Sequence, residues 1–157
     1  MGDYVILLCY AILPSLGTSI VITGQPNLMA VVLSLSYGLI TVGILHSNNT
    51  RDIRNDRRAG IRTLAIQMGC GKAHVAYAVE MVIPYLIIVA CVCFGNLPWY
   101  ALFTLMTVPG AMKNLRQMMD SGFEEAEPIA TLDQQTAQHQ LMFSLLLAAS
   151  CIASAFV

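Results

Sequence analysis

Long apolar runs alternate with short polar segments along this chain. The runs cover residues 4–22, 28–45, 74–94, 97–112 and 137–157. As helices rising about 1.5 Å per residue, such runs cross most or all of a hydrocarbon core about 30 Å thick. Pro14 is expected to kink the first helix, which membrane helices tolerate. The pattern predicts an all-α, multi-pass transmembrane helical bundle of about five spans, forming one membrane domain over residues 1–157.

The composition supports the same class of protein. Charged residues make up only 11% of the chain and hydrophobic residues 57%, whereas soluble domains average about 25% charged residues. We therefore expect membrane lipid around the chain and no nucleic-acid partner. The five cysteines form no CxxC pair and lie mostly in apolar runs, so we expect small buried side chains and neither a zinc site nor a disulfide framework.

The basic residues are distributed unevenly between the two ends of the predicted bundle. With five spans, the N-terminus and the polar loops 46–73 and 113–136 share one side of the membrane. All eight Lys and Arg residues lie in these two loops, and the turns at 23–27 and 95–98 carry none. The excess of positive charge predicts that this side is cytoplasmic, or its topological equivalent in an organelle.

The loop 46–73 holds the candidate chemistry. Asn48, Asp52 and Asp56 are spaced four residues apart, so they lie on one stripe if the segment is helical. Mg²⁺ takes one or two protein carboxylates and completes its shell with water and phosphate oxygens, and the neighbouring arginines are suited to bind phosphate. The alternative is a solvated loop whose aspartates pair locally with arginines. The spacing alone leaves both open. Gly60 and Gly69 are expected to break the helix.

Several further polar residues lie in or beside the spans. Glu80 lies about two turns into the third run; it is either an intramembrane functional acid or shallow enough to reach the headgroups. Three histidines at span ends are expected to be interfacial: His46, His74 and His139. Three acids in the second polar loop are expected to be solvated: Glu124, Glu125 and Glu127.

The segment from Asn48 to Gly60, followed by Arg62-Thr63-Leu64-Ala65 and Gly69, resembles the second aspartate-rich motif of the UbiA superfamily of membrane prenyltransferases. The paired asparagines before Arg51-Asp52 are similar to the MenA branch, and the stretch from His46 to Asp52 is most similar to its eukaryotic relatives, which form menaquinone-4. Gly2-Asp3 and Thr136-Ala137-Gln138 are similar to the openings of the family's fifth and last helices. Asp133 stands where the family usually has proline, and His139 where it often has leucine.

The resemblance implies a particular place in a larger fold. The family is built of nine transmembrane helices around a central cavity, in two pseudo-repeated halves that each carry an aspartate-rich motif. This sequence resembles helices five to nine, and the first motif, of the form Asn-Asp-x-x-Asp-x-x-x-Asp, is not found in it. The resemblance therefore implies a missing N-terminal half as a partner. It also implies an integral membrane protein of the endoplasmic reticulum, Golgi or mitochondria if eukaryotic, and of the plasma membrane if bacterial.

The implied activity is Mg²⁺-dependent transfer of a prenyl group from an isoprenyl diphosphate to an aromatic, naphthoquinol-type acceptor in menaquinone or vitamin K biosynthesis. By resemblance, the catalytic residues and metal ligands are Asp52 and Asp56. Asn48 and Asn49 would orient ligand or metal, and Arg51 and Arg57 would contact the diphosphate. The alternative is a non-catalytic membrane fragment or scaffold that retains half of the diphosphate site. CDP-alcohol phosphotransfer is disfavoured because its longer Asp-Gly-Ala-Arg pattern is absent.

Overall fold

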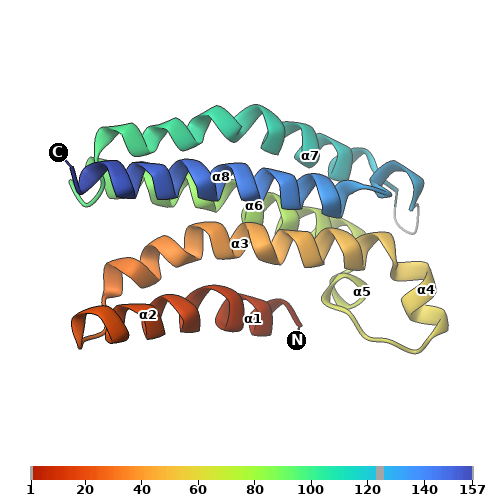
Figure 1. Ribbon diagram of the computed structural model, residues 1–157. Helices are drawn as coiled ribbons and strands as arrows, with labels where there is room; N and C mark the ends of the chain where they lie inside the picture. The colour runs from red at the N-terminus through yellow and green to blue at the C-terminus, as the bar shows by residue number, and fades with distance from the viewer. Residues whose placement is uncertain (1, 123–125, 157) are drawn as a thin grey trace.

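The computed structural model describes residues 2–122 and 126–156, and every regular element within them is helical (Figure 1). The prediction of an all-α membrane bundle is therefore confirmed. Glu124 and Glu125 lie outside the described residues, while Glu127 is exposed as expected. The elements in chain order are α1 (Gly2–Leu7), the π-helix η1 (Leu8–Ile12), α2 (Leu13–Thr23), α3 (Leu28–Arg51), α4 (Ile53–Arg58), α5 (Leu64–Met68), α6 (Cys70–Cys93), the 3₁₀-helix η2 (Trp99–Thr107), α7 (Val108–Asp120), the 3₁₀-helix η3 (Glu127–Ile129) and α8 (Leu132–Ser154).

Four helical stretches in the described part of the chain are long and apolar enough to cross a membrane. They cover Gly2–Thr23, Leu28–Arg51, Gly71–Cys93 and Glu127–Ser154. The run 97–112, which we expected as a further span, forms η2 and the start of α7 and is not among the four. Its helix continues to Asp120, through Lys113 and Arg116, and these charges reduce the apolar length.

The first span is not a regular α-helix. The five residues of η1 form a π-helical turn, and Pro14 follows in the first turn of α2. Proline has no amide hydrogen to donate and its ring clashes with the carbonyl four residues earlier. The wider turn of η1 before Pro14 relieves that clash, as single π turns inside α-helices do.

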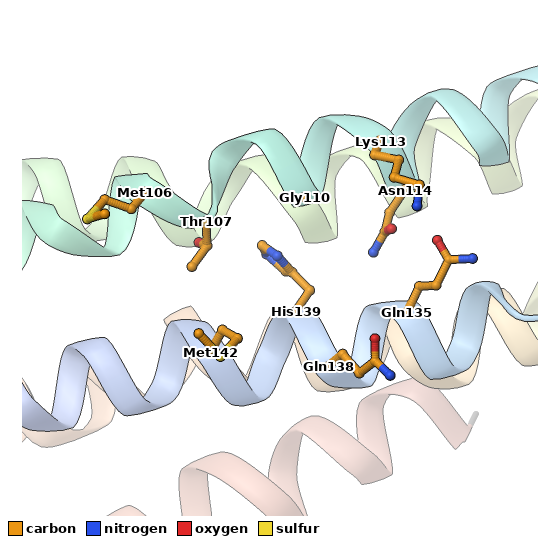
Figure 2. Close-up of a pocket in the computed structure, with 9 residues that line it drawn as sticks. All are labelled: Met106, Thr107, Gly110, Lys113, Asn114, Gln135, Gln138, His139 and Met142. Carbon is orange, nitrogen blue, oxygen red and sulfur yellow. The ribbon is translucent and has the colours of Figure 1, made fainter.

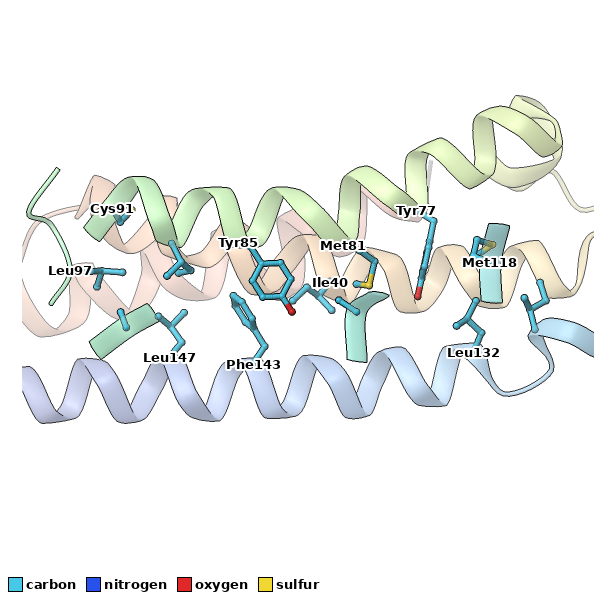
Figure 3. Packing of buried hydrophobic residues seen from close by; sticks show 14 residues of the cluster. Ile40, Tyr77, Met81, Tyr85, Cys91, Leu97, Met118, Leu132, Phe143 and Leu147 are labelled. Atoms are coloured by element: carbon cyan, nitrogen blue, oxygen red, sulfur yellow. The ribbon is translucent and has the colours of Figure 1, made fainter. Parts of the chain in front are cut away.

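Helix α3 is the central element, packing against α6 and α8 on one side and α1 and η1 on the other. Its approach to η1 depends on Gly38, where an added Cβ would lie 2.5 Å from the Cβ of Ala11. Figure 3 shows the core between α6 and α8, where Tyr85 extends from α6 toward Phe143 and Tyr77 extends toward the end of α8 that carries Leu132. The buried hydroxyls of Tyr77 and Thr136 form a 2.7 Å hydrogen bond across this interface.

The polar segment 46–73, which was expected to be a loop, is mostly helical. Helix α3 continues to Arg51, Asp52 interrupts it with φ −93° and ψ 6°, and α4 follows at once. Gly60 and Gly69 end α4 and α5 with positive φ values of 70° and 76°, as predicted. A small buried cluster holds α4 and α5 against the start of α6; its members are Ile53, Ala65 and Ala73, with Ile66 packed on them.

The charged segments gather at one end of the bundle. Figure 1 shows α4, α5 and the start of α8 at the right of the view, while the α2–α3 and α6–η2 turns lie at the left. This arrangement places the candidate site at the end of the bundle that carries the basic residues.

Candidate active site

Arg51 is the centre of the polar cluster at the end of α3. Its Nη1 donates to Oδ2 of Asp133 at 2.7 Å and to the backbone carbonyl of Ala130 at 3.2 Å. Its Nε and Nη2 donate to the two carboxylate oxygens of Asp52 at 3.1 and 3.2 Å. Nη2 also donates to Oδ1 of Asn48. One guanidinium therefore joins the end of α3 to the start of α8.

Asp52 and Asp56 lie on successive turns of a nearly continuous helix. The amide of Asp52 donates to the carbonyl of Asn48 at 3.0 Å, and the amide of Asp56 donates to the carbonyl of Asp52 at 2.9 Å. The expected stripe of Asn48, Asp52 and Asp56 is thus formed along the backbone, across the junction of α3 and α4. Asp52 also pairs locally with Arg51, as the solvated-loop alternative expected.

The remaining candidate residues lie beside this stripe. Asn49 is half-buried on α3, next to Asn48, and Arg57 is exposed on α4, next to Asp56. The structure therefore brings Asn48 and Asp52 together at the guanidinium of Arg51. Asp56 and Arg57 lie one turn further along the chain.

Two neighbouring cavities follow one face of α3 away from this cluster, with α8 contributing to both. The first cavity, of about 300 Å³, has Asn48 and Asp133 in its wall together with Ile6, Tyr10, Thr41, Ile44 and Leu45. The second cavity, of about 540 Å³, is lined by Ser15, Ala30, Leu33, Ser34, Tyr37, Gln140, Ser144, Leu147, Ala148 and Cys151. We call the two together the α3–α8 groove.

The two cavities follow a single stripe of each helix. On α3 the lining positions recur every three or four residues from Ala30 to Asn48, which is the spacing of one helix face. At 1.5 Å per residue this stripe is about 27 Å long. Asn48 and Asp133 stand at the charged end, and Ala30 and Cys151 at the other end. The groove is lined mainly by apolar atoms, so it suits a long apolar chain with a polar head.

A second buried polar group lies between α3 and α6. Nδ1 of His46 is 3.3 Å from Oε1 of Glu80, and their side chains are 0% and 10% exposed. His74 and His139 are also buried, at 8% and 7% exposure. The histidines thus lie between helices instead of on an exposed interface, and Glu80 points into the bundle instead of reaching the headgroups. His46 and Glu80 are buried as a pair, since buried charges are stable only with partners.

Asp133 is a site residue whose role could not be predicted from the sequence, where it stands out only as a departure from the family pattern. The signal was a single acid at the start of the last span, on the same side as an arginine-rich segment. The groove itself had no sequence signal, because its walls come from helices far apart in the chain.

The donor set at the junction of α3 and α4 suits a hard cation. Asp52, Asp56 and Asn48 offer carboxylate and amide oxygens, which Mg²⁺ prefers. Among the described residues, no three of His, Cys, Asp or Glu converge closely enough to hold a metal ion by themselves. A magnesium ion here would need further oxygens from water or a phosphorylated ligand, as magnesium sites normally do.

Comparison with known proteins identifies the family of this chain. The model of the UbiA prenyltransferase family matches residues 1–131. UbiA prenyltransferase domain-containing protein 1 of Ailuropoda melanoleuca is 36% identical over 147 residues, covering 92% of this chain and 41% of that protein. The human protein of that name is 33% identical over 147 residues, with 92% and 40% covered. The Drosophila melanogaster homolog is 34% identical over 151 residues, with 96% and 40% covered. No solved structure matches the chain.

These findings define an integral membrane protein with a helical bundle and a polar site at one end. The chain belongs to the UbiA prenyltransferase family. It spans about two fifths of the length of the curated relatives that it matches.

Proposed function

We propose that this chain forms the diphosphate-binding half of a prenyltransferase site. The reaction moves a prenyl group from an isoprenyl diphosphate to an aromatic, naphthoquinol-type acceptor, in menaquinone or vitamin K biosynthesis. The observation that carries the proposal is the continuity between the Asn48–Arg51–Asp52 cluster and the α3–α8 groove. A charged head and a long apolar tail need such a pair of adjoining environments.

The carboxylates of Asp52 and Asp56 hold Mg²⁺ in this proposal, with Asn48 and Asn49 orienting the ligand or the metal. When bound, Mg²⁺ acts as a Lewis acid on the diphosphate oxygens as they gain negative charge. The half-exposed position of Asp52 and Asp56 leaves room for the water and phosphate oxygens that complete the magnesium shell.

Arg51 and Arg57 contact the diphosphate. The five N–H groups of Arg51 donate to Asn48, Asp52, Asp133 and the carbonyl of Ala130, so its charge is fixed beside the site, and a phosphate oxygen contacts it by replacing one of these acceptors. A positive charge fixed at this place stabilises the negative charge that develops on the leaving group. Asp133 is therefore a positioning residue for Arg51 in this proposal.

The α3–α8 groove receives the prenyl tail. Its walls are largely apolar, so they exclude water from the tail and from the allylic carbon next to the diphosphate. Departure of the diphosphate leaves an allylic cation, and a water-poor site protects that cation from hydrolysis until the aromatic ring attacks it.

The proposal extends to the part of the relatives that this chain does not cover. We infer that an N-terminal half supplies the first aspartate-rich motif and completes the site, and that the charged end of the bundle faces the cytoplasm. The chain by itself is then expected to show no turnover, because half of the charged groups at the diphosphate are absent.

Prenyl transfer from geranylgeranyl diphosphate to a reduced naphthoquinone, in nanodiscs containing Mg²⁺, tests the proposal. We expect no product from the chain alone, product when it is combined with the N-terminal half of a relative, and loss of product in the combined sample carrying Asp52→Ala. Turnover by the chain alone would refute the expected dependence on a second half. A combined sample that is inactive with the unaltered chain would favour the non-catalytic scaffold.

A further inference from the structure

A second polar pocket lies between α7 and α8, lined by residues of η2, α7 and α8 (Figure 2). Its volume is about 360 Å³, and its lining residues are Met106, Thr107, Gly110, Lys113, Asn114, Gln135, Gln138, His139 and Met142. None of these residues lines the α3–α8 groove. We call this space the α7–α8 pocket.

The pocket is polar at one end and apolar at the other. Lys113, Asn114 and Gln135 lie toward the charged end of the bundle, where α7 ends and α8 begins. Met106 and Met142 lie two turns deeper along η2 and α8, and Figure 2 shows them together at the far side. Such a gradient matches an amphiphile whose head lies at the membrane surface and whose chain enters the bilayer.

Two side-chain amides in the pocket wall have unused hydrogen-bonding capacity. Asn114 is 3% exposed, and its Nδ2 has no hydrogen-bond partner among the described residues. The Oε1 of Gln135 also has none, although its Nε2 donates to Oγ1 of Thr131 at 2.9 Å. Buried polar atoms without partners are costly. A ligand that accepts from Asn114 and donates to Gln135 would remove this cost.

His139 and Gly110 form the floor of the α7–α8 pocket. The Nε2 of His139 lies 3.1 Å from the hydroxyl of Tyr85, which also bonds to Oγ1 of Thr107 at 2.7 Å. A Cβ added to Gly110 would lie 3.4 Å from Nδ1 of His139. The missing side chain at Gly110 therefore leaves open space in front of the imidazole, which Figure 2 shows directed toward α7.

The charge of the pocket restricts the ligand. Lys113 supplies one positive charge, and none of the nine described lining residues is acidic. One cation with neutral donors suits a ligand with a single negative charge. A diphosphate carries more charge and suits the arginine-rich segment at the other site. The amide oxygen of Gln135 adds a requirement for a hydroxyl or another donor on the head.

We propose that the α7–α8 pocket binds the head of a membrane phospholipid that carries one phosphodiester charge and a free hydroxyl. The phosphodiester accepts from Lys113 and Asn114, the hydroxyl donates to Gln135, and the acyl chain passes between Met106 and Met142. The site is separate from the proposed diphosphate site, and its occupancy does not depend on prenyl transfer.

Native mass spectrometry of the detergent-purified chain, titrated with phosphatidylglycerol, phosphatidylcholine or oleate, tests the proposal. Phosphatidylglycerol carries both required groups, phosphatidylcholine lacks the net charge, and oleate lacks the hydroxyl. We expect phosphatidylglycerol to bind about tenfold more tightly than either of the others, the ratio that loss of one charged hydrogen bond produces. Equal binding of the three ligands would overturn the proposal.

Three variants locate the binding. Lys113→Gln and Gly110→Leu are expected to weaken phosphatidylglycerol binding about tenfold, the first by removing a charged donor and the second by filling the pocket. Arg116→Gln, which removes an exposed charge from the same helix outside the pocket, is the matched control and is expected to bind as the unaltered chain does. An equal loss in Arg116→Gln would show non-specific charge attraction and overturn the proposal. Displacement of phosphatidylglycerol by farnesyl diphosphate would also overturn it, whether or not transfer activity is found.

Discussion

The Nη1 atom of Arg51 lies 2.7 Å from Oδ2 of Asp133, and this ion pair joins residues 82 positions apart in the chain. It lies at the charged end of the α3–α8 groove, because Asp133 lines the groove and Arg51 also bonds to Asn48 and Asp52. The geometry of the candidate diphosphate site thus depends on how the first turn of α8 meets the last turn of α3.

Asp133→Asn tests the contribution of this contact to stability. The two side chains are 22% and 20% exposed, so solvent screens the pair, and we expect a loss of about 0.5–1 kcal/mol in the free energy of unfolding. Chemical unfolding in detergent, followed by circular dichroism, measures it. Asp120→Asn removes an exposed acid and should change stability less. A double-mutant cycle with Arg51→Gln that shows no coupling would mean that the contact does not stabilise the fold.

The buried pair of His46 and Glu80 should have a larger effect. Asp3 of α1, 5% exposed, interacts electrostatically with both side chains, so three helices share this polar interior. His46→Leu leaves the Glu80 carboxylate buried without its partner, which is expected to cost about 3–5 kcal/mol.

The double variant His46→Leu with Glu80→Leu separates pairing from packing. Because it removes both polar groups, we expect it to recover most of the stability lost in His46→Leu. Glu127→Leu, at an exposed acid, is the control. The unfolding midpoint in detergent is the readout, and a double variant as unstable as the sum of the two single variants would contradict an interaction between the pair.

Gly38 is expected to be intolerant of any side chain. A Cβ at this position would lie 2.5 Å from the Cβ of Ala11 and 2.9 Å from Cδ1 of Leu7, so Gly38→Ala must separate α3 from η1. We expect a loss of about 1–3 kcal/mol, as for other overpacked contacts. Gly17→Ala on α2 is the matched control, since an added Cβ there meets nothing within 4 Å and alanine favours a helix by about 1 kcal/mol. Equal stability of the two variants would argue against close packing of this hairpin.

The helices were predictable because their signals are local. Uncharged length indicated the spans, and glycines at 60 and 69 indicated the ends of α4 and α5. The structure of the run 97–112 was harder to predict, since η2 and α7 form one helical path whose second half is charged. Whether this run is a membrane span or part of a longer, partly polar helix depends on where the helix ends. The residues around Asp120 do not mark that end clearly in the sequence.

The candidate site was predictable only where its residues are neighbours in sequence. Asn48, Asp52 and Asp56 follow helical spacing, so their stripe could be read from the chain. The partners Asp133 for Arg51 and Glu80 for His46 come from distant segments. No periodicity relates residues on different helices, so these contacts depend on how α3, α6 and α8 pack.

Binding of farnesyl diphosphate tests the central claim most directly. The measurement is isothermal titration calorimetry of the chain in nanodiscs, combined with the N-terminal half of a relative, in Mg²⁺ or in EDTA. We expect Mg²⁺ to tighten binding by at least about tenfold, because a metal that joins two carboxylates to a diphosphate contributes several kcal/mol. Asp52→Asn with Asp56→Asn should abolish that gain, and Asp120→Asn should keep it. Equal affinity in Mg²⁺ and EDTA, or an undiminished magnesium effect in the double variant, would contradict the assignment of Asp52 and Asp56 to the metal.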